Sequence, residues 1–186
     1  MLGRDFFKDD AEVLARKLLG CMLTHDSEEG LTAGIIVETE CYSQDDAASH
    51  SYRGMTERTR VMFGPGGYGY VYFTYGMHYC FNVVSGPDGH GQAVLIRALE
   101  PKQGIKLMRK RRGKDNIYEL ASGPAKLVQA LGITKQDYGR PLFEGSLFIK
   151  KRSIEPEIAT GPRIGIKQAT GKPWRFWIKD NPFVSR

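Results

Sequence analysis

Residues 68–85, YGYVYFTYGMHYCFNVVS, limit what this chain can fold into more than any other segment. Aromatic and β-branched residues fill both halves of the segment, and such residues favour β-strands. Tyr75-Gly76 lies near its middle, where the glycine marks a turn. The segment therefore predicts two strands joined in a β-hairpin. Two further segments predict strands, 31–42 (LTAGIIVETECY) and 92–98 (QAVLIRA).

Three other segments predict helices. Residues 9–20 begin with two aspartates, repeat apolar residues at helical spacing and end in glycine. A second helix is expected from 100 to 112, opened by Glu-Pro, and a third from 122 to 132, opened by Ser-Gly-Pro and closed by glycine. The tail, 141–186, adds short strands (LFIKK and WRFWI) between Pro and Gly turns. Because few helices stand between consecutive strands, we expect one mixed α/β domain over residues 1–186, with a mainly antiparallel sheet flanked by helices.

The composition is that of a folded, basic domain. With 186 residues, of which 41% are hydrophobic and 26% charged, the chain can form one core, and a wholly disordered protein is excluded. The net charge is +6, and the pI of about 9.2 reaches the range that suggests a nucleic-acid partner. A basic enzyme that never meets DNA would show the same balance. The run 109–114, RKRRGK, is equally compatible with a solvated helix end and with phosphate contacts.

The sequence lacks convincing motifs for a dinucleotide site, a zinc site or a disulfide framework. Residues 64–69, GPGGYG, match the glycine pattern of dinucleotide sites, but a proline interrupts them and a β-rich run follows, so we expect a turn into the hairpin. The three cysteines and four histidines lack the spacing of a zinc site or a disulfide framework. We therefore expect reduced thiols, no metal and no cofactor. The N-terminus lacks the pattern of a signal peptide, and no segment approaches the ~18 apolar residues of a membrane span, so we expect a cytosolic protein without membrane attachment.

Alternation within residues 31–42 brings a carboxylate beside an aromatic ring. Side chains two apart on a strand share a face, which places Glu38, Glu40 and Tyr42 together. The opposite face carries Val37, Thr39 and Cys41. A carboxylate next to a ring suits a pocket that stacks a flat ligand and reacts beside it. An exposed polar strand face is the alternative.

Tyrosine is concentrated in the predicted hairpin. Five of the nine tyrosines fall within residues 68–79. In a basic protein such rings are suited to stacking on nucleic-acid bases, although they could also edge a sheet over the core. Tyr75, beside the turn glycine, is placed to project outward, as the wedges that enter a DNA minor groove do.

Seven motifs stand in order along nearly the whole chain: IVETECY (36–42), DDAASHSYRG (45–54), MFGPGGYGYVYFTYGMHYCFNVV (62–84), LIRALEP (95–101), SGPAKL (122–127), GPRIGI (161–166) and the ending KPWRFW…NPFVS. In their sequences and their order, these motifs resemble those of the alkyladenine (3-methyladenine) DNA glycosylases. The resemblance implies a curved sheet and a protruding hairpin that enters the DNA minor groove.

The resemblance also implies roles for individual residues in the reaction. Glu40 is similar to the base that deprotonates the attacking water in that family. Arg97 and the main-chain carbonyl of Ile164 are similar to the groups that hold this water.

The remaining roles concern the damaged base. Tyr42, His50 and Tyr72 resemble the walls that sandwich a base flipped out of the duplex, and Tyr75 resembles the wedge that fills its place. Asn82 resembles the residue that screens the purine 2-position. The alternative for Asn82 is a strand residue that bonds locally to backbone.

The activity that the resemblance implies is hydrolysis of the N-glycosidic bond of alkylated or deaminated purines in duplex DNA, the first step of base excision repair. Because several such bases are cationic, an electron-rich aromatic cage would attract them. No lysine lies in the segments around Glu40, Tyr72 or Asn82 to form a Schiff base, so we expect a monofunctional enzyme.

The expected partner is double-stranded DNA containing damaged purines, with no obligate protein partner. The enzyme would act in the cytoplasm on nucleoid DNA, or in the nucleus of a eukaryote. The alternative is a non-catalytic nucleic-acid-binding domain that uses the same basic surface and tyrosines.

Overall fold

The computed structural model describes residues 1–74, 76 and 78–185. Its strands are β1 (Met22–Ser27), β2 (Gly30–Tyr42), β3 (Gly69–Thr74), β4 (His78–Val84), β5 (Ala93–Gln103), β6 (Leu147–Lys150), β7 (Ile158–Gly161) and β8 (Arg175–Ile178). Its α-helices are α1 (Ala11–Leu18), α2 (Ile105–Arg112) and α3 (Pro124–Leu131). Short 3-10 helices cover Arg4–Phe7, Arg60–Phe63, Ile117–Glu119 and Lys135–Asp137. Tyr75, the predicted wedge, lies outside the described residues, and none of the described helices could cross a membrane.

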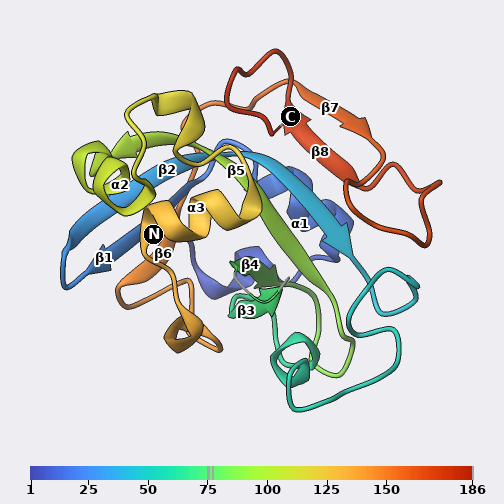
Figure 1. The fold of residues 1–186 in the computed structure, drawn as a ribbon. Coiled ribbons are helices and arrows are strands. Elements are labelled where there is room, and N and C mark those ends of the chain that lie inside the picture. The colour runs from blue at the N-terminus through green and yellow to red at the C-terminus, as the bar shows by residue number, and fades with distance from the viewer. Residues whose placement is uncertain (75, 77, 186) are drawn as a thin grey trace.

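The strands form one curved sheet, as Figure 1 shows. Its main order is β3-β4-β5-β2-β1-β6, and the pairings between described strands are all antiparallel. The long strand β2 lies at its centre. One edge of β2 pairs with β5, and the other pairs first with β1 and then, at residues 38–40, with β8. The prediction of a mixed α/β fold with a curved, mainly antiparallel sheet is confirmed.

The predicted strands at 31–42 and in the hairpin are confirmed as β2, β3 and β4. The predicted helix from residue 100 was wrong at its start. Glu100 and Pro101 continue β5 and pair with Ile35 and Gly34 of β2, so sheet pairing overrides the helix-opening preference of Pro. The helix α2 begins only after Gly104, whose φ of 71° makes the turn. Strands β1 and β7 were not anticipated.

The other two helices lie where the sequence predicts them. The helix α3 ends at Gly132, which has a φ of 68°. Asp10 occupies the N-cap position of α1, but its side chain makes no capping bond and accepts a hydrogen bond from Gln92. One side of α1 faces solvent, since Val13 is 49% exposed while Leu14 is buried.

The basic run 109–114 ends α2 and is largely used for internal contacts. Arg111 is partly buried and donates to the Ala130 carbonyl of α3 and to Ser27 of β1. Arg112 donates to the Leu120 carbonyl. These two arginines therefore do not form the solvated helix end that was one of the two interpretations, because they tie α2 to its neighbours. Phosphate contact by the run stays a prediction.

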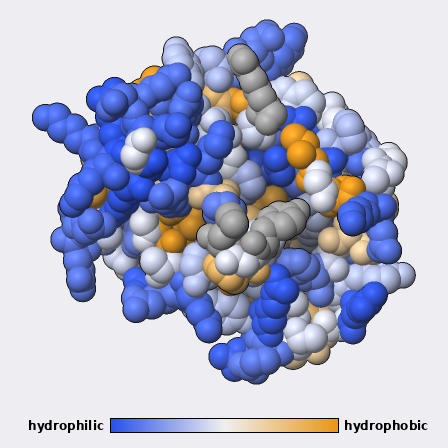
Figure 2. Space-filling view, in the orientation of Figure 1, coloured by the Kyte–Doolittle hydropathy of each residue, from blue (hydrophilic) through white to orange (hydrophobic). Residues whose placement is uncertain are grey.

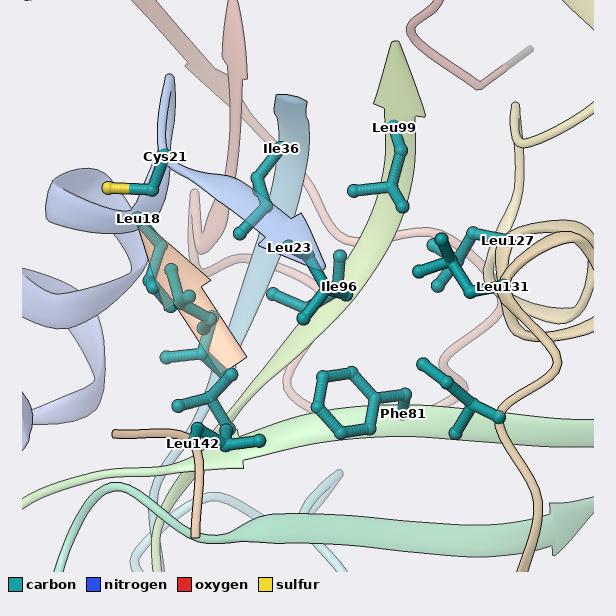
Figure 3. Packing of buried hydrophobic residues seen from close by; sticks show 14 of the residues in the cluster. Leu18, Cys21, Leu23, Ile36, Phe81, Ile96, Leu99, Leu127, Leu131 and Leu142 are labelled. Carbon is teal, nitrogen blue, oxygen red and sulfur yellow. The ribbon is translucent and has the colours of Figure 1, made fainter. Parts of the chain in front are cut away.

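The main hydrophobic core lies between the concave sheet and the helices α1 and α3 (Figure 3). It includes Ile36 of β2, Phe81 of β4 and Ile96 of β5, together with Leu127 and other residues of α3. The chain end covers a separate part of the sheet, where Phe183 packs against residues of β2 and β5. The central strand β2 is therefore buried from both sides, which explains its continuous run of buried residues.

The glycine-rich segment 64–69 leads from a 3-10 helix into β3, as predicted, and no helix follows it. Its glycines allow close backbone approaches. A Cβ on Gly66 would lie 2.1 Å from the carbonyl oxygen of Phe7. A Cβ on Gly64 would meet only the Val61 oxygen, at 3.4 Å. The pattern therefore reflects packing of backbone on backbone.

Gly66→Ala is expected to destabilise the fold by about 1–3 kcal/mol, because its Cβ overlaps a backbone atom that cannot move freely. For a chain of this size, each kcal/mol lowers Tm by ~2–4 °C. Gly64→Ala is the matched control and should leave Tm nearly unchanged. Thermal unfolding followed by circular dichroism measures both variants. Equal Tm values for the two variants would contradict this account of the segment.

Candidate functional site

A cavity of about 520 Å³ lies between the hairpin, the ends of β2 and β5, and the loops 47–50 and 164–168. Cavities of this size take small organic ligands. Six of the eight predicted site residues line it: Tyr42, His50, Tyr72, Asn82, Arg97 and Ile164. The hairpin lies at the centre of the face seen in Figure 1, and Figure 2 shows apolar patches among hydrophilic side chains around that centre. The long-range fold thus brings together residues that the sequence spreads from 42 to 164.

Glu40 is the seventh predicted residue, and it lies directly behind the cavity wall. Its side chain is fully buried, and its carboxylate contacts three cavity-lining residues. The Ile164 N–H donates to Oε1 over 2.8 Å, and the Tyr42 hydroxyl donates to Oε2 over 2.8 Å. The guanidinium of Arg97 lies 3.3 Å from Oε1. The carboxylate is thereby held in one orientation against the cavity.

The contact of Ile164 with Glu40 is made by its N–H group, while its predicted role concerned its carbonyl. The N–H bond is a feature that the sequence did not predict. The role of the carbonyl in holding water stays a prediction.

Burial raises the pKa of Glu40 above its usual value. The Arg97 charge, the Ile164 N–H and the Tyr42 hydroxyl all act in the opposite direction and favour the carboxylate. Burial outweighs these groups, so the Glu40 carboxylate accepts a proton more readily than an exposed glutamate does. Burial also raises the pKa of Tyr42, which keeps its hydroxyl protonated and able to donate.

Glu38, the other carboxylate of β2, is buried in a closed network. Its Oε1 accepts bonds from Arg97 Nε at 3.1 Å, Arg175 Nε at 2.6 Å and Ser185 Oγ at 2.9 Å. Its Oε2 accepts the Ser185 N–H at 2.7 Å. Arg175 and Ser185 do not line the cavity. Glu38 therefore anchors the chain end and Arg97, while Glu40 is the carboxylate in contact with the cavity wall.

The predicted alternation along β2 is partly wrong, because of a β-bulge. Register shifts flank Glu38, and Val37 has no partner in the pairing with β5. Val37 packs near the chain end beside Phe183, while Thr39 bonds to the Ala15 carbonyl of α1. Val37 therefore does not share the face of Thr39 and Cys41. The alternative of an exposed polar face is excluded, because Glu38 and Glu40 have no exposed surface.

Aromatic rings form one part of the cavity wall. His50 and Tyr72 meet edge to face, with ring centroids 4.6 Å apart, and Tyr70 lies 5.4 Å from Tyr72. The Nδ1 of His50 is hydrogen-bonded to the Tyr70 hydroxyl at 3.0 Å. Burial lowers the pKa of His50 to about 4, so the ring is neutral at pH 7. This wall therefore carries no positive charge from histidine at neutral pH.

Asn82 lies on β4, opposite Tyr70 of β3 and Leu95 of β5. It lines the cavity and is 4% exposed. Its Nδ2 donates to the Tyr70 carbonyl over 3.0 Å. This bond is the local backbone contact that the sequence left open as the alternative. The bond holds the amide at the cavity wall, and the role of Asn82 in screening the purine 2-position stays a prediction.

Several residues near the cavity escaped the sequence analysis. Lys167 lines the cavity, although it is distant along the chain from the segments searched for lysine. The guanidinium of Arg58 lies 5.3 Å from the centre of the Tyr72 ring. Arg163 and Asp46 form a buried ion pair. The motifs DDAASHSYRG and GPRIGI contained the last two, but no local pattern indicated that they meet. Among the described residues, no cluster of His, Cys, Asp and Glu could hold a metal ion.

Comparison with known proteins gives a consistent result over the whole length of the chain. The sequence model of the family described as methylpurine-DNA glycosylase (MPG) matches residues 5–182. A protein of Rhodopseudomonas palustris is 51% identical over 186 residues, which span 100% of this chain and 88% of the relative. A protein of Methanoculleus marisnigri is 50% identical over 97% of this chain and 96% of its own length. One of Carboxydothermus hydrogenoformans is 49% identical over 100% and 99% respectively. The names of all three assign them as 3-methyladenine DNA glycosylases.

The two carboxylates of β2 should differ in their effect on stability. Glu38→Gln is expected to lower the free energy of unfolding by about 3 kcal/mol, because it leaves Arg97 and Arg175 short of a buried anion. Glu40→Gln should cost less, since burial already penalises its charged form. Urea denaturation of the two matched variants measures the difference. A larger loss for Glu40→Gln would contradict the assignment of Glu38 as the structural anchor.

Proposed function

Because this chain belongs to the methylpurine-DNA glycosylase family, we propose that it hydrolyses the N-glycosidic bond of alkylated or deaminated purines in duplex DNA. The proposed substrates are of the 3-methyladenine, 7-methylguanine and hypoxanthine type. Release of the base leaves an abasic site and begins base excision repair. The family match over residues 5–182 supports the class of enzyme.

The observation that carries the mechanism is the buried Glu40 carboxylate, fixed by Ile164, Tyr42 and Arg97 behind a cavity large enough for a base. In the proposed step, Glu40 takes a proton from a water molecule as the water oxygen bonds to the sugar C1′. The bond from C1′ to the base nitrogen breaks, and its electron pair leaves with the base. A raised pKa makes Glu40 a better proton acceptor than an exposed glutamate.

The target must leave the base stack, because its glycosidic carbon is not accessible inside a duplex. We propose that the flipped base enters the cavity beside Tyr42, His50 and Tyr72. A cationic base is attracted to the aromatic rings, and a neutral His50 does not repel it. Such a base also leaves as a neutral molecule and needs little help from an acid. Tyr75 is proposed as the wedge in the vacated stack, although it lies outside the described residues.

The second candidate function, a non-catalytic nucleic-acid binder, is favoured by the positive net charge and the tyrosine-rich hairpin. Stacking and phosphate contacts do not require a buried carboxylate behind the base site. Unlike Glu38, Glu40 has its side-chain bonds with residues that line the cavity, which favours a chemical role for it. Release of free base from methylated DNA by the purified protein distinguishes the two functions.

Glu40→Gln is expected to reduce base release by a factor of ~10²–10⁴, the usual cost of removing a general base. Its affinity for damaged DNA should stay nearly unchanged, because the amide keeps the size of the side chain. Single-turnover release from methylated duplex DNA measures the rate, and fluorescence anisotropy measures the binding. We expect Glu40→Gln to be inactive and Glu38→Gln to keep a reduced activity. The reverse pair would show that the wrong carboxylate was chosen.

Asn82→Ser is expected to raise excision of guanine relative to hypoxanthine. The two rings present the same π-face, so stacking cannot distinguish them. The guanine 2-amino group must therefore clash with the cavity wall or lack a hydrogen-bond partner there. An unpaired polar group costs about 1–3 kcal/mol to bury, which is ~5–150-fold in rate. Asn82 is positioned for this by its bond to the Tyr70 carbonyl. Competition between duplexes with guanine or hypoxanthine opposite thymine measures the ratio, and a ratio equal to that of the unaltered protein would remove Asn82 from this role.

A further inference from the structure

Two loops contribute adjacent stretches of the cavity wall, and each depends on one member of a buried ion pair. Residues 47–50 precede and include His50, and residues 164–168 begin with Ile164. Asp46 comes directly before the first stretch, and Arg163 directly before the second. The side chains of both are fully buried and in contact, although they lie 117 residues apart in the sequence.

Arg163 joins three segments of the backbone. Its Nη1 and Nη2 donate to the two carboxylate oxygens of Asp46, and the Nη2 bond is 3.0 Å long. Nη1 also donates to the Cys41 carbonyl of β2 at 3.0 Å. Nη2 donates to the Ala169 carbonyl at 3.4 Å, which draws together the two ends of the loop that contains residues 164–168. The peptide between Arg163 and Ile164 supplies the N–H that bonds to Glu40.

Asp46 shapes the turn that leads to His50. Its carboxylate accepts the Ala48 N–H at 3.2 Å, and its carbonyl accepts the Ser49 N–H at 2.8 Å. The same carboxylate therefore binds Arg163 and the backbone of the turn. A displacement of Arg163 would loosen the turn before His50 as well as the loop after it.

Aromatic contacts extend the same arrangement to Tyr42. The Arg163 guanidinium lies 4.7 Å from the centre of the Tyr42 ring and 5.3 Å from that of Trp174. The Tyr42 hydroxyl is the donor to Glu40 Oε2. Two of the three groups that contact the Glu40 carboxylate are thus adjacent to Arg163. The Ile164 N–H belongs to the next residue in the chain, and the Tyr42 hydroxyl belongs to the ring that the guanidinium contacts.

A buried ion pair is weak evidence for stability, because the desolvation of both charges offsets much of their attraction. Its geometric effect is the stronger argument in this case. We propose that Arg163 and Asp46 are positioning residues for the reaction, which join the two loops of the cavity wall and hold the Ile164 N–H and the Tyr42 ring in register with Glu40. The proposal rests on Glu40 acting as the base.

The direct test observes the Ile164 amide and does not depend on activity. In protein labelled with ¹⁵N-isoleucine, the Ile164 N–H shift is followed from pH 4 to pH 9, with the signal assigned by its loss in Ile164→Val. The shift should titrate with Glu40 and lose that titration in Glu40→Gln. In Arg163→Met, the titration midpoint should move to higher pH with a smaller amplitude, because the N–H bond that favours the ionised carboxylate is weakened. The other groups facing Glu40, namely Arg97, Glu38, Tyr42 and Arg175, are left in place.

The kinetic test uses single-turnover release of base from methylated duplex DNA. Arg163→Met should reduce the rate by about 10²-fold, as misplacement of a catalytic group by roughly 1 Å does, with DNA affinity little changed. The acid limb of its pH–rate profile should move to higher pH. Arg163→Lys should restore part of the rate. Asp46→Asn, which conserves shape and removes one charge, should reproduce both effects and serves as the main variant if Arg163→Met does not fold.

Arg111→Met is the matched control, since Arg111 is a partly buried arginine of α2 that lies away from the cavity and has backbone and side-chain partners in other segments. It should lower Tm without altering the amide titration or the acid limb. If folded Arg163→Met and Asp46→Asn retain the Ile164 titration and rate of the unaltered protein, while Glu40→Gln is inactive, the positioning proposal fails and the proposed function stands. If the unaltered protein releases no base, the proposed function fails, and the amide titration alone decides whether the ion pair positions Ile164.

Discussion

One guanidinium, that of Arg97, contacts both buried carboxylates of β2, and much of the surrounding structure serves to make this possible. Two negative charges two residues apart in a core are unstable unless donors surround them. The fold meets this need with segments from the end of the chain. The strand β8 pairs beside Glu38 and Glu40, Ser185 bonds to Glu38, and the Ile164 N–H bonds to Glu40. The carboxylates thus organise the last quarter of the chain around the centre of the sheet.

This arrangement gives the two glutamates of β2, Glu38 and Glu40, different surroundings. Glu38 accepts four hydrogen bonds from Arg97, Arg175 and Ser185 and has no contact left for a ligand. Glu40 accepts fewer bonds, all from residues of the cavity wall, and burial raises its pKa. The cavity itself has aromatic walls and a neutral histidine. A buried carboxylate beside such walls is compatible with the proposed reaction, in which a water attacks and a cationic base leaves as a neutral molecule.

Much of the fold could be predicted from local signals. The β-branched run of β2, the two halves of the hairpin and the glycine that closes α3 are each readable within a few residues. The errors arose where tertiary pairing overrides a local preference. Pro101 resembles a helix start, yet it lies in β5 because Gly34 of β2 is available to pair with it. The bulge at Val37 breaks an alternation that the sequence presents as regular.

The sequence by itself determined which residue types the site contains and that Glu40 and Tyr42 lie close together, because a strand repeats every two residues whatever surrounds it. Its ordered motifs also indicated the family. Only the tertiary structure decided that Glu38 is hydrogen-bonded to Ser185 at the chain end. It also decided that the Ile164 N–H bonds to Glu40, 124 residues away in the sequence, and that Asp46 pairs with Arg163. Such contacts depend on the path of the whole chain and on burial in a shared core. Segments so far apart in sequence leave no local periodicity or spacing from which their contact could be inferred.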